Sequence, residues 1–167
     1  MIEIRRAGPD ESRVLGDIHA TSWKAAYAGF FDAAFVADAV EDRRGRWDAR
    51  LGDDSGTILL AVQDGRPLAL SYTSASRTRP GWAEIRSFYA HPDSWGTGVA
   101  GTLMTETLRD LRENGYRRVH LWTARDTAQS RRFYRKSGFA ETGEVRVFEY
   151  GPGYPLDQVE YELTAGA

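Results

Sequence analysis

The sequence predicts an α/β protein in which helices flank both faces of a mixed, mostly antiparallel sheet of six or seven strands. Two observations lead to this prediction. The dipeptide Asp64-Gly65 joins two strand-like runs and can supply the positive φ values of a tight hairpin turn, which indicates antiparallel neighbours. Further along, a strand, a helix and a second strand follow one another, which predicts a right-handed crossover between two parallel strands.

The first half of the chain begins with a strand and continues with helices. Ile2 and Ile4 alternate with charged residues, as in a half-buried strand. Residues 8–11, Gly-Pro-Asp-Glu, are expected to open a helix because proline and acidic residues favour a first turn. Residues 31–51 indicate two further helical pieces. Three strand-like runs follow, at 57–63, 67–76 and 82–90.

The second half adds the crossover helix and the remaining strands. Apolar residues at three- and four-residue spacing predict a helix that extends to Asn114 and ends at Gly115. A strand at 119–123 should run parallel to the strand before that helix. Asp126 and Gln129 resemble a capping box that begins another helix. Two last strands are expected near Phe148 and at 160–163.

Composition narrows the class of protein. A length of 167 residues fits a single domain, 1–167, and a net charge of −2 with interspersed signs argues against a nucleic-acid binder. The absence of cysteine excludes disulfides, thiolate zinc sites and a cysteine nucleophile, and the three scattered histidines suggest no metal site. No secretory signal or run of ~20 apolar residues is visible, so we expect a cytoplasmic protein without a membrane segment.

The glycine-rich segment 95–101 is the first candidate for a binding site. A pyrophosphate needs several backbone N–H groups that converge, and a glycine-rich entry to a helix offers them at the positive end of the helix dipole. The alternative is a plain turn that starts a helix. Residues 96–101 also satisfy a dinucleotide fingerprint, but residues 91–95 separate the first glycine from its strand, and no second βαβ half follows.

With these features, the chain resembles the GCN5-related N-acetyltransferase (GNAT) family from its first strand to its last. The segment 95–100, Trp-Gly-Thr-Gly-Val-Ala, is similar to the family motif Arg/Gln-x-x-Gly-x-Gly/Ala. The segment 133–139, Phe-Tyr-Arg-Lys-Ser-Gly-Phe, is similar to the family's Phe-Tyr-x-x-x-Gly-Phe. Trp95 stands where the family usually has Arg or Gln, Thr127 stands for a common Asn, and Ser130 stands for a common Ala.

The resemblance implies a single N-acetyltransferase domain that uses acetyl-CoA as its acyl donor. The pantetheine arm would pair with the backbone of Tyr89 and Ala90 like an added strand, although the same residues could be ordinary sheet core. Thr127 occupies a position that contacts the cofactor in the family. The residues implied to hold the pyrophosphate are Trp95, Gly96, Thr97, Gly98, Val99, Ala100 and Gly101.

The resemblance also implies how acetyl transfer to a primary amine would proceed, by direct attack in a ternary complex. Tyr134 matches the tyrosine thought to protonate the leaving thiolate, and Glu84 matches a general base on the strand that ends at Ala90. A backbone N–H of Ala90 or Tyr89 would stabilise the oxyanion. The plain alternatives are a half-buried aromatic for Tyr134 and an exposed strand glutamate for Glu84.

The acceptor is a small-molecule or peptide amine that the sequence does not identify. Trp23 and Tyr27 lie on one face of the first helical region and are candidates for acceptor binding or for helix packing. A non-catalytic acyl-CoA sensor with the same fold is the alternative function. A homodimer would cover the sheet edge that the last two strands expose.

Overall fold

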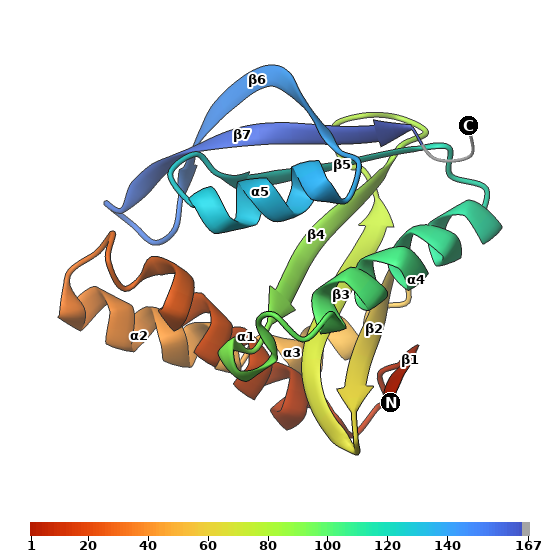
Figure 1. Cartoon of the computed structure of the whole chain (residues 1–167). Coiled ribbons are helices and arrows are strands. Elements are labelled where there is room, and N and C mark those ends of the chain that lie inside the picture. The colour runs from red at the N-terminus through yellow and green to blue at the C-terminus, as the bar shows by residue number, and fades with distance from the viewer. Residues whose placement is uncertain (165–167) are drawn as a thin grey trace. The chain divides into compact units, whose positions relative to one another are not determined.

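A computed structural model of the chain describes residues 1–164. These residues form a seven-stranded sheet with the strand order β1-β2-β3-β4-β5-β7-β6 (Figure 1). The chain divides into two compact units, each made of two separate segments. The first unit takes residues 1–74 and 87–107, and the second takes residues 75–86 and the described chain from 108 onward. The expected class, a mixed and mostly antiparallel sheet with helices, is confirmed.

The first unit contains the N-terminal helices and the antiparallel strands β1, β2 and β3. β1 pairs with β2 and β2 pairs with β3, both antiparallel. Asp64 and Gly65, between β2 and β3, have φ values of 51° and 83°, which confirms the predicted hairpin turn. Its elements are β1 (Ile2–Arg6), α1 (Ser12–Tyr27), α2 (Ala33–Arg44), α3 (Trp47–Leu51), β2 (Gly56–Gln63), most of β3 (Arg66–Ala75), the end of β4 (Ala83–Ala90), the 3-10 turn η1 (Pro92–Ser94) and the beginning of α4 (Val99–Glu113).

Helices cover both faces of the sheet within this unit, because successive side chains of β2 point to opposite faces. Ile58, Leu60 and Val62 belong to a buried cluster with residues of α1 and α3. Leu59 and Ala61 belong to a second cluster with the first turns of α4. The predicted covering of both faces is therefore confirmed in the first unit.

Helix α1 begins four residues later than predicted. The Glu11 carboxylate accepts a hydrogen bond from the Gly8 amide at 2.7 Å and pairs with Arg5, which closes a turn ahead of the helix. The hydrogen bond from Arg5 is the main cause that lowers the pKa of Glu11 to about 2. Residues 8–11 form this turn, so the prediction that they are the first helical turn was wrong.

The second unit contains the parallel strand pair and the C-terminal hairpin. β4 and β5 are parallel, with Ala83 opposite Val119 and Glu84 opposite His120, as predicted. β7 lies between β5 and β6 and pairs antiparallel with both. Besides the end of β3, the start of β4 and the rest of α4, its elements are β5 (Arg118–Ala124), α5 (Ala128–Lys136), β6 (Ala140–Glu149) and β7 (Pro155–Thr164).

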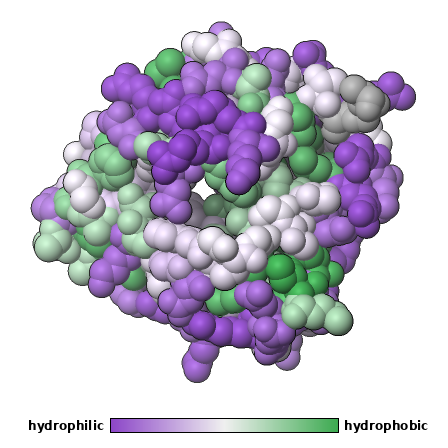
Figure 2. Space-filling view, in the orientation of Figure 1, coloured by the Kyte–Doolittle hydropathy of each residue, from purple (hydrophilic) through white to green (hydrophobic). Residues whose placement is uncertain are grey.

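Helix α5 lacks the predicted capping box. Its N-cap residue is Thr127, not Asp126, and no side chain caps the helix. The Thr127 hydroxyl instead donates to the Ala124 carbonyl at 2.7 Å, which fixes the turn that precedes the helix. The outer surface of α5 is hydrophilic (Figure 2), in agreement with the exposed side chains of Arg132 and Arg135. None of the helices in residues 1–164 is long and apolar enough to span a membrane.

A buried polar network ties the C-terminal strands of the second unit together. Glu160 is 1% exposed, and its carboxylate accepts hydrogen bonds from Arg79 at 2.9 and 2.5 Å and from Thr142 at 2.8 Å. His120 lies 2.9 Å from the same carboxylate and 2.6 Å from the Ser76 hydroxyl. Burial acts to raise the pKa of Glu160, but the hydrogen bonds outweigh it, so this pKa lies below its ordinary value.

We expect Glu160→Gln to lower the free energy of unfolding by about 2 kcal/mol, because it removes the charge from a buried carboxylate that accepts hydrogen bonds from Arg79 and Thr142. Urea denaturation at pH 7 measures the difference. Glu144→Gln, at an exposed position of β6, is the matched control and should change stability by less than about 0.5 kcal/mol. Equal stability of the two variants would contradict a structural role for this network.

Candidate active site

The glycine turn, residues 95–101, links β4 and η1 to helix α4 in the first unit. Gly96 and Gly98 have φ values of 78° and 89°, a region that other residues rarely adopt. A Cβ atom added at either glycine would meet no protein atom within 4 Å. The turn thus presents backbone with open space above it. A ligand can approach the main chain closely at both positions.

Buried and hydrogen-bonded residues within and next to the glycine turn hold its backbone in place. Ser94 is buried and donates through its amide and its hydroxyl to the His91 carbonyl, at 2.8 and 2.7 Å. The Ser94 carbonyl accepts the Thr97 amide at 3.1 Å. Val99 is fully buried in the cluster below α4. These contacts fix the backbone before any ligand binds, which lowers the entropic cost of binding.

The beginning of α4 offers hydrogen-bond donors for an anion. The first helical hydrogen bond recorded in this helix runs from the Thr102 amide to the Gly98 carbonyl, at 3.0 Å. The amides of the preceding first turn have no acceptor within the helix, and the helix dipole makes this end positive. The donor set and the open space above the glycines therefore suit the pyrophosphate of a CoA molecule.

The end of β4 carries the residues expected to pair with a pantetheine arm. The Trp95 indole, 45% exposed, donates to the Ala90 carbonyl at 3.2 Å and so folds the turn back onto the strand. A carbonyl has two lone pairs, so Ala90 can accept a second hydrogen bond. The Tyr89 ring packs on His19, with ring centroids 4.3 Å apart. Burial lowers the pKa of His19 to about 2, which keeps this imidazole neutral.

One edge of β4 pairs only briefly with its parallel neighbour. The pairing with β5 comprises Ala83 with Val119 and Glu84 with His120. Pairing of an extended ligand with the backbone of Tyr89 and Ala90, as an added strand, stays a prediction.

The two candidate acceptor residues lie in an aromatic cluster on α1. Trp23 and Tyr27 are 1% and 8% exposed, with ring centroids 5.1 Å apart. Trp23 also stacks on Phe31 at 6.2 Å, and the Arg43 guanidinium lies over its ring at 4.4 Å. This burial favours helix packing for both side chains. Acceptor binding by Trp23 and Tyr27 stays a prediction.

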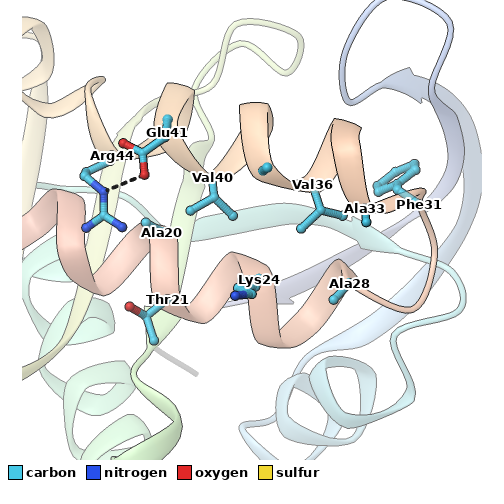
Figure 3. Close-up of a pocket in the computed structure, with 11 residues that line it drawn as sticks. Ala20, Thr21, Lys24, Ala28, Phe31, Ala33, Val36, Val40, Glu41 and Arg44 are labelled. Carbon is cyan, nitrogen blue, oxygen red and sulfur yellow. Dashed lines mark hydrogen bonds and ion pairs between the residues drawn. The ribbon is translucent and has the colours of Figure 1, made fainter.

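A groove of about 930 Å³ lies between α1 and α2 (Figure 3). Val36 and Val40 of α2 form its apolar wall, and Lys24 of α1 contributes an ammonium group. Arg44 at its end is paired with Glu41 at 3.4 Å. Neither of the two candidate acceptor residues on α1 lines this groove. Because its carboxylate, Glu41, is paired with Arg44, we assign the groove no catalytic role.

The second unit holds the candidate acid, Tyr134. It is 8% exposed on α5, and its ring packs against Phe139 and Tyr161 at 6.1 and 6.0 Å. These contacts fix the ring on the face of the sheet that α5 covers. Thr127 is the N-cap residue of α5. It is buried, and its hydroxyl donates to the Ala124 carbonyl. A cofactor contact by Thr127 stays a prediction.

The candidate base, Glu84, is half-buried on β4 and lies opposite His120 in the parallel pairing. Tyr89, Ala90 and the glycine turn belong to the first unit, together with Trp23 and Tyr27. Tyr134, Thr127 and Glu84 belong to the second unit. Glu84 and Ala90 share a face of the sheet only if side chains alternate regularly between the two faces along β4, so this expectation stays a prediction. Residues 1–164 contain no group of three or more His, Asp or Glu side chains that could hold a metal ion.

Sequence reasoning missed one polar group that the structure places near Glu84. The Arg146 guanidinium lies over two aromatic rings, 4.3 Å from the Trp122 centroid and 5.2 Å from the Phe148 centroid. Glu84 acts electrostatically on Arg146. The alternation of residues 145–148 could have indicated that Arg146 and Phe148 share a face. The partner Trp122 depends on the position of β7 between β5 and β6, which no local pattern encodes.

Comparison with known proteins gives a family match and two relatives in sequence. The chain matches the acetyltransferase (GNAT) family over residues 20–139. An uncharacterized N-acetyltransferase of Mycobacterium tuberculosis is 32% identical over 114 residues, which make up 68% of this chain and 71% of that protein. The mycothiol acetyltransferase of Cellulomonas flavigena is 34% identical over 108 residues, which make up 59% of this chain and 30% of that protein.

The crystal structure of the PaiA N-acetyltransferase of Thermoplasma acidophilum in complex with coenzyme A is similar, with a TM-score of 0.78. The match has 19% sequence identity and covers 98% of this chain and 99% of that chain. At this level of identity the likeness shows that the two proteins share a fold.

Proposed function

Because the chain belongs to the acetyltransferase (GNAT) family, we propose that it transfers an acetyl group from acetyl-CoA to a primary amine of a small molecule or peptide. The observation that carries the proposal is the glycine turn. Gly96 and Gly98 leave open space beside backbone donors at the start of α4, which is the arrangement that a pyrophosphate requires.

In the proposed complex, the pyrophosphate of acetyl-CoA accepts hydrogen bonds from backbone amides of the glycine turn other than that of Thr97, which donates to the Ser94 carbonyl. Backbone donors suit this chain, because Trp95 replaces the usual charged or amide side chain and already donates to Ala90. The pantetheine arm lies along the last residues of β4 and pairs with the backbone of Tyr89 and Ala90 as an added strand would. This position directs the thioester to the end of β4 that precedes the turn.

The chemistry requires a neutral amine, a stabilised oxyanion and a proton for the leaving group. The amine nitrogen attacks the thioester carbonyl carbon, the C–N bond forms, and the C–S bond breaks. Glu84 takes the proton from the amine, directly or through water, and Tyr134 gives a proton to the departing thiolate. An amide of Tyr89 or Ala90 donates to the oxyanion. No acyl-enzyme is formed.

Two measurements test the proposal together. Calorimetric titration with acetyl-CoA measures donor binding, and thiol release over a panel of amines, antibiotics and peptides measures transfer. We expect binding of acetyl-CoA and thiol release with at least one acceptor. Binding without thiol release from any acceptor would favour the acyl-CoA sensor. A protein that does not bind acetyl-CoA would contradict the proposal.

The role of Glu84 predicts a change in pH dependence. In Glu84→Gln, kcat/KM should fall about tenfold at pH 7 and approach the wild-type value near pH 10, where a free amine is neutral without a base. The pH–rate profile of both enzymes measures this convergence. Glu162→Gln, another half-buried strand glutamate, is the matched control and should leave the profile unchanged. An unaltered profile in Glu84→Gln would exclude Glu84 as the base.

A further inference from the structure

The guanidinium of Arg146 is held in a fixed plane on the second unit. It lies over the rings of Trp122 and Phe148, with centroid distances of 4.3 and 5.2 Å. Its Nε donates to the Gln158 Oε1 at 2.7 Å, and the Gln158 Nε2 donates to the Tyr150 hydroxyl at 2.8 Å. Gln158 and Tyr150 are both buried, so this chain of hydrogen bonds anchors the arginine.

The terminal nitrogens of Arg146 remain available to a ligand. Within residues 1–164, no ion pair is formed by Arg146, and its one hydrogen bond is the one made by Nε. No buried side-chain nitrogen or oxygen in this part of the chain lacks a partner, so the two terminal nitrogens reach solvent. A guanidinium whose Nε is hydrogen-bonded to the protein can use its two terminal nitrogens to bind an anion in a bidentate manner.

The surroundings of Arg146 favour a carboxylate over a more highly charged anion. Glu84 and Glu160 both act electrostatically on the Arg146 guanidinium, and two neighbouring carboxylates would repel a dianion. A planar carboxylate matches the guanidinium fork. Glu84, in the same neighbourhood, attracts a positively charged amine. The two charges together fit a molecule that carries both an amine and a carboxylate.

We propose that Arg146 binds the carboxylate of the acceptor, and that the acceptor is therefore an amino acid. This inference rests on the proposed acetyl transfer and names its substrate class. In this arrangement the amine of the amino acid is directed to Glu84, while its carboxylate pairs with the terminal nitrogens of Arg146. Arg146 acts as a specificity-determining residue and takes no part in proton transfer.

The test compares acceptors that differ only in the carboxylate. Thiol release is measured with the twenty L-amino acids, each beside its carboxamide. We expect at least one amino acid to have a kcat/KM about 100-fold above that of its amide, since a site built for one polar group discriminates strongly against its absence. Each carboxamide keeps the amine and the side chain of its amino acid, so the comparison measures the effect of the carboxylate.

Two variants assign the discrimination to Arg146. Arg146→Gln should raise KM for the preferred amino acid at least about tenfold with a smaller change in kcat, and should leave the amide unchanged. Arg146→Lys keeps the charge but loses the planar fork, and should lose most of the discrimination as well. Arg118→Gln is the matched control, because Arg118 also lies over an aromatic ring of this unit, 4.4 Å from the Trp82 centroid, and should behave as wild type.

A binding measurement keeps this inference separate from the proposed function. Addition of each amino acid to the protein labelled with ¹⁵N-arginine should shift the Nε resonance of Arg146, identified by its loss in Arg146→Lys, and the amide should not. Thiol release that is equal for acids and amides would overturn the inference and leave acetyl transfer standing. If no acceptor releases thiol, the resonance decides alone, and an unshifted Arg146 signal with every amino acid overturns the inference.

Discussion

Gly98→Ala should raise the Kd for acetyl-CoA about 100-fold, which corresponds to about 2.7 kcal/mol, or one to two charged hydrogen bonds. Gly98 has a φ of 89°, and a Cβ at this position costs about 1–2 kcal/mol of backbone strain in the native turn. The turn relieves that strain by rotating the adjacent peptide groups. Those peptide groups carry the donors proposed to hold the pyrophosphate. Calorimetric titration with acetyl-CoA measures the loss.

The other end of α4 supplies the control for Gly98→Ala. Gly115 has a φ of 91° and, like Gly98, no protein atom within 4 Å of an added Cβ. Gly115→Ala should therefore destabilise the protein to a similar extent but leave the Kd for acetyl-CoA unchanged. Similar losses of affinity in the two variants would show that the effect is general strain, and would contradict a phosphate site at Gly98.

Tyr134→Phe should lower kcat by about 100- to 1000-fold, because it removes the proposed donor to the leaving thiolate. The ring contacts with Phe139 and Tyr161 remain, so the Kd for acetyl-CoA should stay within about twofold of the wild-type value, a difference near 0.4 kcal/mol. Steady-state thiol release at saturating acceptor measures kcat, and titration with acetyl-CoA measures the Kd.

Tyr161 provides the control for the loss of a phenol. It lies beside Tyr134, and its hydroxyl is hydrogen-bonded to Arg131 at 3.0 Å and to Glu141 at 3.0 Å. Tyr161→Phe should cost about 1 kcal/mol of stability without lowering kcat. If Tyr134→Phe keeps its kcat, the acid is another group or water. If both variants lose kcat equally, the effect comes from packing of the sheet.

Most elements of the fold follow from local patterns that the sequence displays. The hairpin at Asp64-Gly65 was predicted because only a few residue pairs tolerate two positive φ values. The end of α4 at Gly115 was predicted because glycine readily adopts the positive φ of the residue that follows a helix. The starts of α1 and α5 were predicted wrongly, because side chains there bond to other groups. Glu11 bonds to the Gly8 amide and to Arg5, and Thr127 bonds to a carbonyl of the preceding strand.

The candidate site also contains parts that local patterns predict and parts that they do not. The glycine turn could be located from the sequence because its proposed function depends on backbone, and glycine marks backbone that must adopt unusual angles or be approached closely. Trp23 and Tyr27 were correctly placed on one helical face, but their burial depends on contacts with Phe31 and Arg43. Periodicity indicates which residues share a face, and it does not indicate what covers that face.

The sequence by itself indicated most strands and helices, the position of the glycine turn at residues 95–101 and the family resemblance that includes Tyr134. The tertiary structure decided which distant side chains meet. β7 lies between β5 and β6, and this order brings Arg146 to Trp122 and joins His120 to Glu160. Local conformation is encoded by neighbouring residues, whereas strand order is set by the burial of the whole sheet, so no short segment of the sequence reveals these contacts.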